Sequence, residues 1–115
     1  MDANALMMPF QFSINLDLEI GRLLGSFELV VPSTVLAELE KVAAERKTPE
    51  ARAALRLAAR YRTHGMEGAG DDAVLAAAIE LGAILLTNDA GLRRRARRAG
   101  LRTIFLRGRN HLELV

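Results

Sequence analysis

The sequence predicts an α/β fold: a three-layer α/β/α sandwich with a central parallel sheet. Residues 83–86 form a short, continuously apolar run that ends in the polar residues 87–89, which is typical of a strand covered on both faces. Helical patterns alternate with other short apolar runs, and this alternation favours parallel strands joined by helices. The 115 residues, 50% of them hydrophobic, can bury one core, so we expect a single domain over residues 1–115.

The first part of the chain predicts a helix, a strand and a second helix. Residues 10–20 alternate like a strand but also place apolar residues at helical spacing, and we favour a loop followed by a helix that ends near Gly25. Residues 27–31 are a short β-rich run that Pro32 stops. Residues 33–46 have apolar side chains at helical spacing and predict the second helix.

A third helix is predicted from its start signal. Thr48, Pro49 and Glu50 supply an N-cap, a proline at the first helical position and an acid in the first turn. We expect this helix to end near residues 64–65. The glycine-rich residues 66–70 then lead into the central stretch of the sequence.

The central stretch, residues 71–89 (DDAVLAAAIELGAILLTND), carries acids at both ends of an apolar segment. Its first part predicts a helix buried on most sides and stopped by Gly82, because it is apolar apart from Glu80. The strand at residues 83–86 follows and brings Asp89 to its carboxyl end. Ligands bind at this edge of open α/β sheets, and several acids gathered there would need a cation to neutralise them.

A basic helix and another strand are predicted after the central stretch. The inner face of the helix is expected at Leu92, Ala96 and Ala99, and Gly100 lies beyond its end. The outer face consists of Arg93, Arg94, Arg95, Arg97 and Arg98. Residues 102–106 (RTIFL) have the composition of a buried strand.

The charge of the chain is unevenly distributed. Residues 89–115 contain eight arginines and two acids, a balance of +6, whereas residues 1–88 contain eight bases and twelve acids, a balance of −4. All but two of the basic residues are arginine, whose planar guanidinium suits phosphate. A basic end beside a cluster of acids predicts a polyanionic substrate.

The composition also excludes several classes of protein. Without cysteine, the chain has no disulfide, no thiolate zinc site and no cysteine nucleophile, so any metal would be held by oxygen. The two histidines, His64 and His111, are far apart, and we interpret them as surface residues. No apolar run approaches the length that spans a bilayer, and the amino terminus has no basic region ahead of an apolar core, so we expect a cytoplasmic protein without membrane contact.

Four motifs along the chain carry a resemblance to a known family. They are MDAN at the start, VPSTVLAELEKV at residues 31–42, the acidic pair at residues 71–72 and ILLTND at residues 84–89. Their order resembles that of PIN domains, and the resemblance covers essentially the whole chain. It is closest to the archaeal and eukaryotic branch linked to ribosomal RNA processing, because of DANALMMP, ELEKV and RGRNHLELV. The chain is similar, less closely, to the toxin nucleases of toxin–antitoxin pairs.

The resemblance implies a metal-dependent endoribonuclease that hydrolyses RNA phosphodiester bonds with magnesium or manganese. The implied catalytic and metal-binding acids are Asp2, Glu38, Asp71 and Asp89, with Asn4, Asp72 and Thr87 in support. Periodicity alone does not separate Glu38 from Glu40, and the resemblance makes that choice. Either Asp71 or Asp72 fits the third acid, and the spacing usual in the family favours Asp71. The arginines implied in RNA binding are Arg93, Arg94, Arg97 and Arg98.

Clustered carboxylates suit this chemistry. They are the hard oxygen ligands that magnesium and manganese prefer, and two divalent ions about 4 Å apart can activate a water and stabilise the leaving oxygen. The same acids also have a structural explanation, because Asp71, Asp72 and Asp89 stand at helix starts, where carboxylates cap the backbone.

Two competing interpretations come from other classes of protein. A receiver-type signalling domain needs a lysine after its last strand, and we reject this interpretation because the only lysines, Lys41 and Lys47, precede the third predicted helix. A PIN-like module that binds RNA or acts as a scaffold without cutting stays open, because the strand that normally precedes the family's first aspartate is absent from the sequence. Either the assigned start is late, or the sheet lacks a central strand. The expected partners are RNA, a second copy in a homodimer, and a ribosome-assembly factor or an antitoxin.

Overall fold

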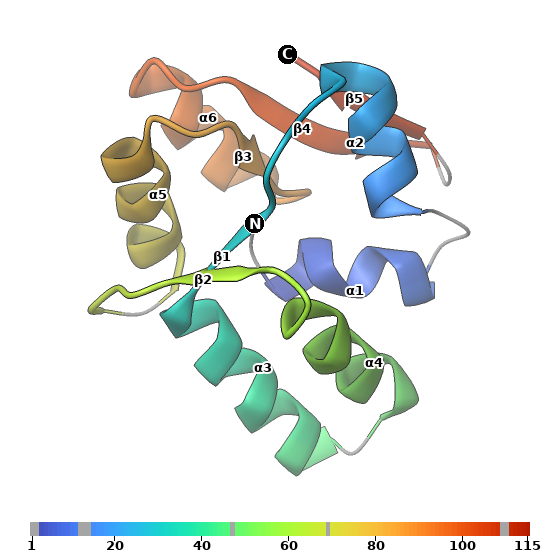
Figure 1. The fold of residues 1–115 in the computed structure, drawn as a ribbon. Helices are drawn as coiled ribbons and strands as arrows, with labels where there is room; N and C mark the ends of the chain where they lie inside the picture. Colours follow the sequence, from blue (N-terminus) through green and yellow to red (C-terminus); the bar gives the residue numbers. More distant parts are fainter. Residues whose placement is uncertain (1–2, 12–14, 47, 69, 109–110) are drawn as a thin grey trace.

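The computed structural model describes residues 3–11, 15–46, 48–68, 70–108 and 111–115, with the backbone alone at residues 3, 4, 10 and 11. Six helices and five strands are described, and Figure 1 shows their arrangement. In chain order they are α1 (Ala3–Gln11), α2 (Leu16–Leu24), β1 (Val30–Pro32), α3 (Ser33–Arg46), α4 (Pro49–Ala58), β2 (Arg62–His64), α5 (Gly70–Leu81), β3 (Leu85–Leu86), α6 (Ala90–Arg98), β4 (Thr103–Arg107) and β5 (His111–Leu114).

The described strands form two small sheets rather than one. β1 pairs with β2 in parallel, and Val31 lies opposite Thr63. β3 pairs with β4 in parallel, and β4 pairs with β5 in the antiparallel direction. The α/β class is therefore confirmed. The predicted three-layer sandwich around one central parallel sheet is not confirmed, because the described residues form a two-stranded and a three-stranded sheet instead.

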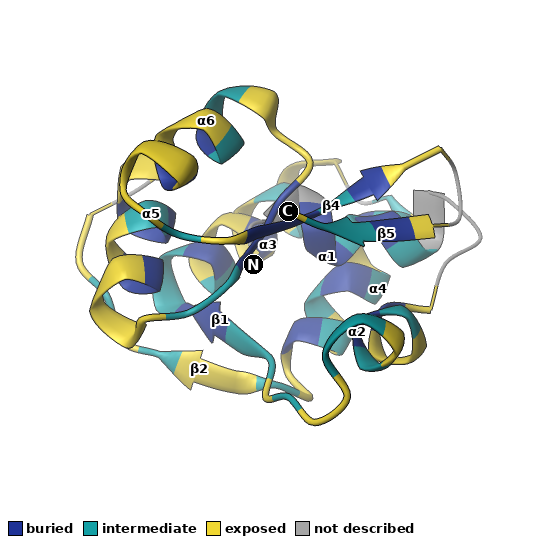
Figure 2. Cartoon of the chain, turned by 90° about the horizontal axis from the view of Figure 1, so that it is seen from above, coloured by how far each residue is buried: buried dark blue, intermediate teal, exposed yellow. Residues whose placement is uncertain are grey.

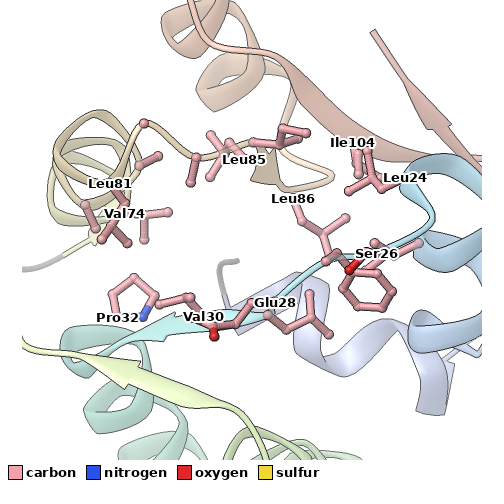
Figure 3. Close-up of a pocket in the computed structure, with 18 residues that line it drawn as sticks. Leu24, Ser26, Glu28, Val30, Pro32, Val74, Leu81, Leu85, Leu86 and Ile104 are labelled. Carbon is pink, nitrogen blue, oxygen red and sulfur yellow. The ribbon is translucent and has the colours of Figure 1, made fainter.

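An apolar pocket lies between the two sheets. It has a volume of about 410 Å³ and opens between β1 and β3 (Figure 3). Its walls include Leu24 from α2, Val74 and Leu81 from α5, and Val30 and Leu86 from the strands. In the described part of the chain, β1 and β3 are not hydrogen-bonded to each other and no described strand lies between them. A hollow thus occupies the place where a continuous sheet would join them, and helix contacts such as those between α3 and α5 link the two sheets.

Several helix boundaries agree with the sequence prediction. α3 spans Ser33–Arg46, and α2 ends before Gly25, which has a φ of 73°. α4 begins as predicted, because the hydroxyl of Thr48 accepts a hydrogen bond of 3.3 Å from the Ala51 amide. The boundaries that agree carry local signals, such as the Thr48 cap and the positive φ of Gly25, so they can be predicted without tertiary information.

α1 is a helix that the sequence pattern does not predict, and turn-prone Pro9 lies inside it. A proline in a helix interior costs about 3 kcal/mol. The helix buries Leu6 and Met8, which are at most 1% exposed, and each such side chain contributes about 1.5–3 kcal/mol. Burial of this face therefore outweighs the hydrogen bond that the proline removes.

α4 ends at Ala58 and not near residues 64–65 as predicted. The amides of Arg60 and Tyr61 bond to carbonyls three residues back, at 3.0 and 3.1 Å, in the tight turn that terminates the helix. The chain then continues into β2, which pairs with β1. The prediction was wrong here because the polar sequence RTH has no apolar alternation that would indicate a strand.

The strands also differ in extent from the prediction. β1 begins at Val30 and includes Pro32, which ends it, so the predicted strand at residues 27–31 is displaced. β3 is shorter than predicted and contains only Leu85 and Leu86. The strand predicted at residues 102–106 is confirmed as β4, whereas β5 is not predicted at all.

The core follows the inner faces of the helices and the strands β3 and β4, as the burial colours in Figure 2 show. α5 buries Ala73, Val74, Ala77 and Ala78. Its Ile79 is 52% exposed, so α5 is covered on one side only and not on most sides as predicted. On α6, Leu92 and Ala96 are buried as predicted, but Ala99 is exposed at the helix end. No helix within the described ranges is long and apolar enough to cross a membrane.

Candidate active site

Asp89 lies at the carboxyl end of β3, as predicted, and caps the start of α6. Its Oδ1 accepts a hydrogen bond of 2.9 Å from the amide of Leu92. A Cβ atom on Gly91 would come within 3.2 Å of that oxygen, so the glycine leaves room for the cap. The carboxylate is exposed, and its second oxygen remains available to a ligand. Asp89 therefore has a structural role, and this role does not occupy the whole carboxylate.

The turn that carries Asp89 is fixed by its two polar neighbours. Thr87 is fully buried, and its hydroxyl accepts a hydrogen bond of 3.1 Å from the Asp89 amide. Asn88 Oδ1 accepts a hydrogen bond of 3.0 Å from the amide of Leu106 in β4. The sequence TND thus connects the end of β3 to both α6 and β4. Asn88 is a positioning residue that sequence reasoning missed, and its place between two predicted site residues was the available signal.

Asp71 and Asp72 lie in the first turn of α5, and both are exposed. Asp72 Oδ1 accepts a hydrogen bond of 2.5 Å from Nη2 of Arg95 on α6, in an ion pair that is open to solvent. Asp71 has no hydrogen bond or ion pair with any described residue. The carboxylate of Asp71 is therefore the freer of the two, which agrees with the choice that the family spacing favours.

Glu38 is an exposed residue of α3, as is Glu40. Within the described residues, no three histidine, aspartate or glutamate side chains gather closely enough to hold a metal ion, so Glu38, Asp71 and Asp89 alone do not form such a site. Asp2 lies outside the described residues, as does the side chain of Asn4. The convergence of four acids that includes Asp2 stays a prediction.

The arginines of α6 fall into different environments. Arg93, Arg94 and Arg97 line a cavity of about 480 Å³ between α6 and β4, which we call the arginine cleft. Its lining consists of Ala90, Arg93, Arg94, Arg97, Thr103, Phe105, Arg107 and Val115. Arg98 is exposed but does not line the cleft, and Arg95 is paired with Asp72.

Two residues of β4 in the arginine cleft were missed by sequence reasoning. Phe105 and Arg107 alternate with buried residues along the strand and lie on the side of the cleft, as period-two patterning requires. This alternation in the sequence places Phe105 and Arg107 on one face of the strand. It does not show that this face borders α6, which only the packing of β4 reveals.

The two histidines differ from each other in the structure. His111 is exposed, as predicted. The side chain of His64 is only 18% exposed, and its Nε2 lies 3.6 Å from Oε2 of Glu80 on α5. His64 is therefore only partly exposed and not the fully exposed surface residue that was predicted, because its ring lies beside Glu80. Neither histidine belongs to a described group of metal ligands.

Comparison with known proteins identifies the family. A family model described as a PIN like domain matches residues 1–109. The chain is also 32% identical over 111 residues to Ribonuclease VapC9 of Archaeoglobus fulgidus, an alignment that covers 92% of this chain and 80% of that protein. The match spans the motifs around Glu38, Asp71 and Asp89. The chain belongs to the PIN-like domain family.

Proposed function

We propose that the chain is a ribonuclease that hydrolyses RNA phosphodiester bonds with the help of magnesium or manganese. The observation that carries this proposal is the similarity to a ribonuclease over 92% of the chain. Because that relative is a VapC ribonuclease, the proposal adopts the toxin-type alternative. The closer resemblance to the rRNA-processing branch, expected from the sequence, has no support among the comparisons and is not retained.

The acids proposed to hold the metal are Asp2, Glu38, Asp71 and Asp89. Their chemistry fits a hard divalent cation, because Asp71 is exposed without a partner in the described part of the chain and Asp89 uses one oxygen for its cap. Bound divalent ions would supply an activated water and offset charge on the leaving oxygen. The turn formed by Thr87 and Asn88 would hold Asp89 in place, and Asn4 would support Asp2.

The proposed substrate is single-stranded RNA, and the arginines of α6 that line the arginine cleft, Arg93, Arg94 and Arg97, would hold its backbone. Phosphate contacts of this kind position a strand without reading its sequence. A toxin-type nuclease would also have an antitoxin partner, and a homodimer is a further proposal that oligomeric-state measurements can decide.

The direct test is cleavage of an end-labelled single-stranded RNA by the purified chain. We expect endonucleolytic products with magnesium or manganese and none with a chelator. Binding of the RNA without cleavage under both conditions would favour the module that binds RNA without cutting. Undiminished cleavage in the chelator would exclude the metal mechanism.

The two acids at the start of α5 should differ in their importance. Asp71→Asn is expected to lower activity more than about tenfold, which is the least that metal-site partners usually contribute. Asp72→Asn should lower it less than about threefold, because its exposed pair with Arg95 contributes little, of the order of 0–1 kcal/mol. Each change removes one negative charge from the first turn of α5, which usually costs below about 1 kcal/mol, so a thermal melt should show similar stability. The opposite ranking of rates would make Asp72 the ligand.

A further inference from the structure

The arginine cleft concentrates positive charge that the chain itself leaves largely uncompensated. Arg94 and Arg97 form no ion pair with any described residue, and both are exposed. Arg107 pairs through Nε with Oε2 of Glu113, which leaves its outer N–H groups available. Three guanidinium groups from two different elements therefore converge on one concave surface, as expected for a polyanion site rather than for a solvated helix face.

A fourth arginine in the cleft has a different role. The guanidinium carbon of Arg93 lies 4.1 Å from the centre of the Phe105 ring, at cation–π distance. Its Nε is shielded from solvent and has no hydrogen-bond acceptor among the described residues. The guanidinium of Arg93 thus lies over an aromatic ring, and none of the described acids pairs with it. A planar group supported in this way offers its other face to a nucleobase.

The cleft lies next to the proposed catalytic acid Asp89. Ala90, the residue that follows Asp89, lines one end of it, and Arg97 lines the other. Arg97 lies seven positions after Ala90, and at a rise of about 1.5 Å per residue the cleft extends roughly 10 Å along α6. A single-stranded RNA that enters the cleft at Arg97 would therefore reach the start of α6, where Asp89 caps the helix.

We infer that the arginine cleft is the subsite for the nucleotides that flank the scissile phosphate of single-stranded RNA. Arg94, Arg97 and Arg107 bind successive phosphates. The stack of Arg93 on Phe105 holds one unpaired base. This inference rests on the proposed function and adds a base-stacking platform to a chain that contains four phenylalanines, one tyrosine and no tryptophan. It also divides the predicted RNA-binding arginines, because Arg98 lies outside the subsite.

The first test compares arginines inside and outside the cleft. Binding of a fluorescent single-stranded RNA is measured by anisotropy across a range of salt concentrations, with chelator present to prevent cleavage. Arg94→Ala should weaken binding about fivefold at 0.1 M salt and reduce the salt slope by about 0.7, the value of one phosphate contact on a single strand. Arg107→Ala should do the same.

Each of these variants has a matched control. Arg98→Ala removes an exposed arginine of the same helix, and Arg102→Ala removes an exposed arginine just before β4. Both controls should bind within twofold of the unchanged chain. Equal losses from Arg94→Ala and Arg98→Ala would overturn the inference, because binding would then depend on total charge and not on the cleft.

The second test separates stacking from charge. Arg93→Lys keeps the charge but removes the planar face, so the salt slope should stay constant. Affinity for RNA should fall at least about fivefold, the lower end of what one stacked base contributes. An abasic strand with the same number of phosphates should bind the variant and the unchanged chain equally. A variant that binds both strands like the unchanged chain would refute the platform.

Two further results distinguish the alternatives. Polyglutamate at matched charge should compete poorly, and competition as strong as that of RNA would assign the cleft to an acidic protein segment instead. Failure of the proposed function has a different signature. If RNA binding depends on the cleft but no metal supports cleavage, the cleft is an RNA-binding site and the nuclease assignment fails. If cleavage occurs but the cleft variants bind RNA like their controls, the nuclease assignment stands and the cleft is not the RNA subsite.

Discussion

Asp89→Asn should lower ribonuclease activity by more than about a hundredfold while the fold stays intact. Residues that only hydrogen-bond to metal ligands usually contribute about 10–100-fold, and a direct ligand should contribute more. Asparagine caps helices as well as aspartate does, so its side-chain oxygen can replace Oδ1 in the bond to the Leu92 amide. What the change removes is the negative charge. We therefore expect a loss of stability below about 1 kcal/mol, the usual value of one acid at a helix start.

Two other variants make this result interpretable. Asp89→Ala should lose both the activity and the cap, with an additional loss of stability of about 1 kcal/mol in chemical denaturation. Asp17→Asn changes another exposed first-turn acid, on α2, and should keep full activity. If Asp89→Asn retains activity near that of Asp17→Asn, Asp89 is only a helix cap, and the proposed metal site loses its best-placed acid.

Removal of divalent ions should abolish cleavage, and their addition should stabilise the chain. An ion that binds only the native state adds about 2.7 kcal/mol at a concentration of 100 times its dissociation constant. Manganese or magnesium should therefore raise the midpoint of thermal unfolding in a concentration-dependent way. This readout requires no RNA, so it tests the metal site separately from catalysis.

The double variant Asp71→Asn with Asp89→Asn is the matching control. It should melt at the same temperature with and without the ion, because half of the proposed ligand set is gone. An equal rise in the unchanged chain and in the double variant would place the bound ion elsewhere. Absence of any rise, combined with cleavage in chelator, would mean that the acids do not act through a metal.

The parts of the fold that could be predicted from sequence carry their own local signals. α3 follows from helical spacing, the start of α4 from its Thr48 cap, and the ends of α5 and α6 from Gly82 and Gly100, both with positive φ. α1 and β2 depend instead on tertiary contacts. Pro9 is tolerated because its helix is buried, and the polar residues of β2 form a strand because β1 lies beside them.

The same distinction applies to the candidate site. The position of Asp89 at the end of β3 follows from a strand pattern closed by TND, and the structure confirms this position. The pairing of Asp72 with Arg95 and the stacking of Arg93 on Phe105 join elements that are distant in sequence. Such contacts depend on how α5, α6 and β4 pack together, and periodicity within one element contains no information about that.

The pocket between β1 and β3 also determines how cooperatively the chain can unfold. In the described residues no backbone ladder crosses this hollow, so the β1–β2 sheet and the β3–β4–β5 sheet share only side-chain contacts and helices (Figure 3). Opening one sheet does not require breaking the hydrogen bonds of the other. Sub-global opening of either half therefore costs less free energy than complete unfolding. Asp71, Asp89 and the arginine cleft lie on α5, α6 and β4, while Glu38 lies with the other sheet, so a fluctuation between the halves would change the distance between proposed ligands.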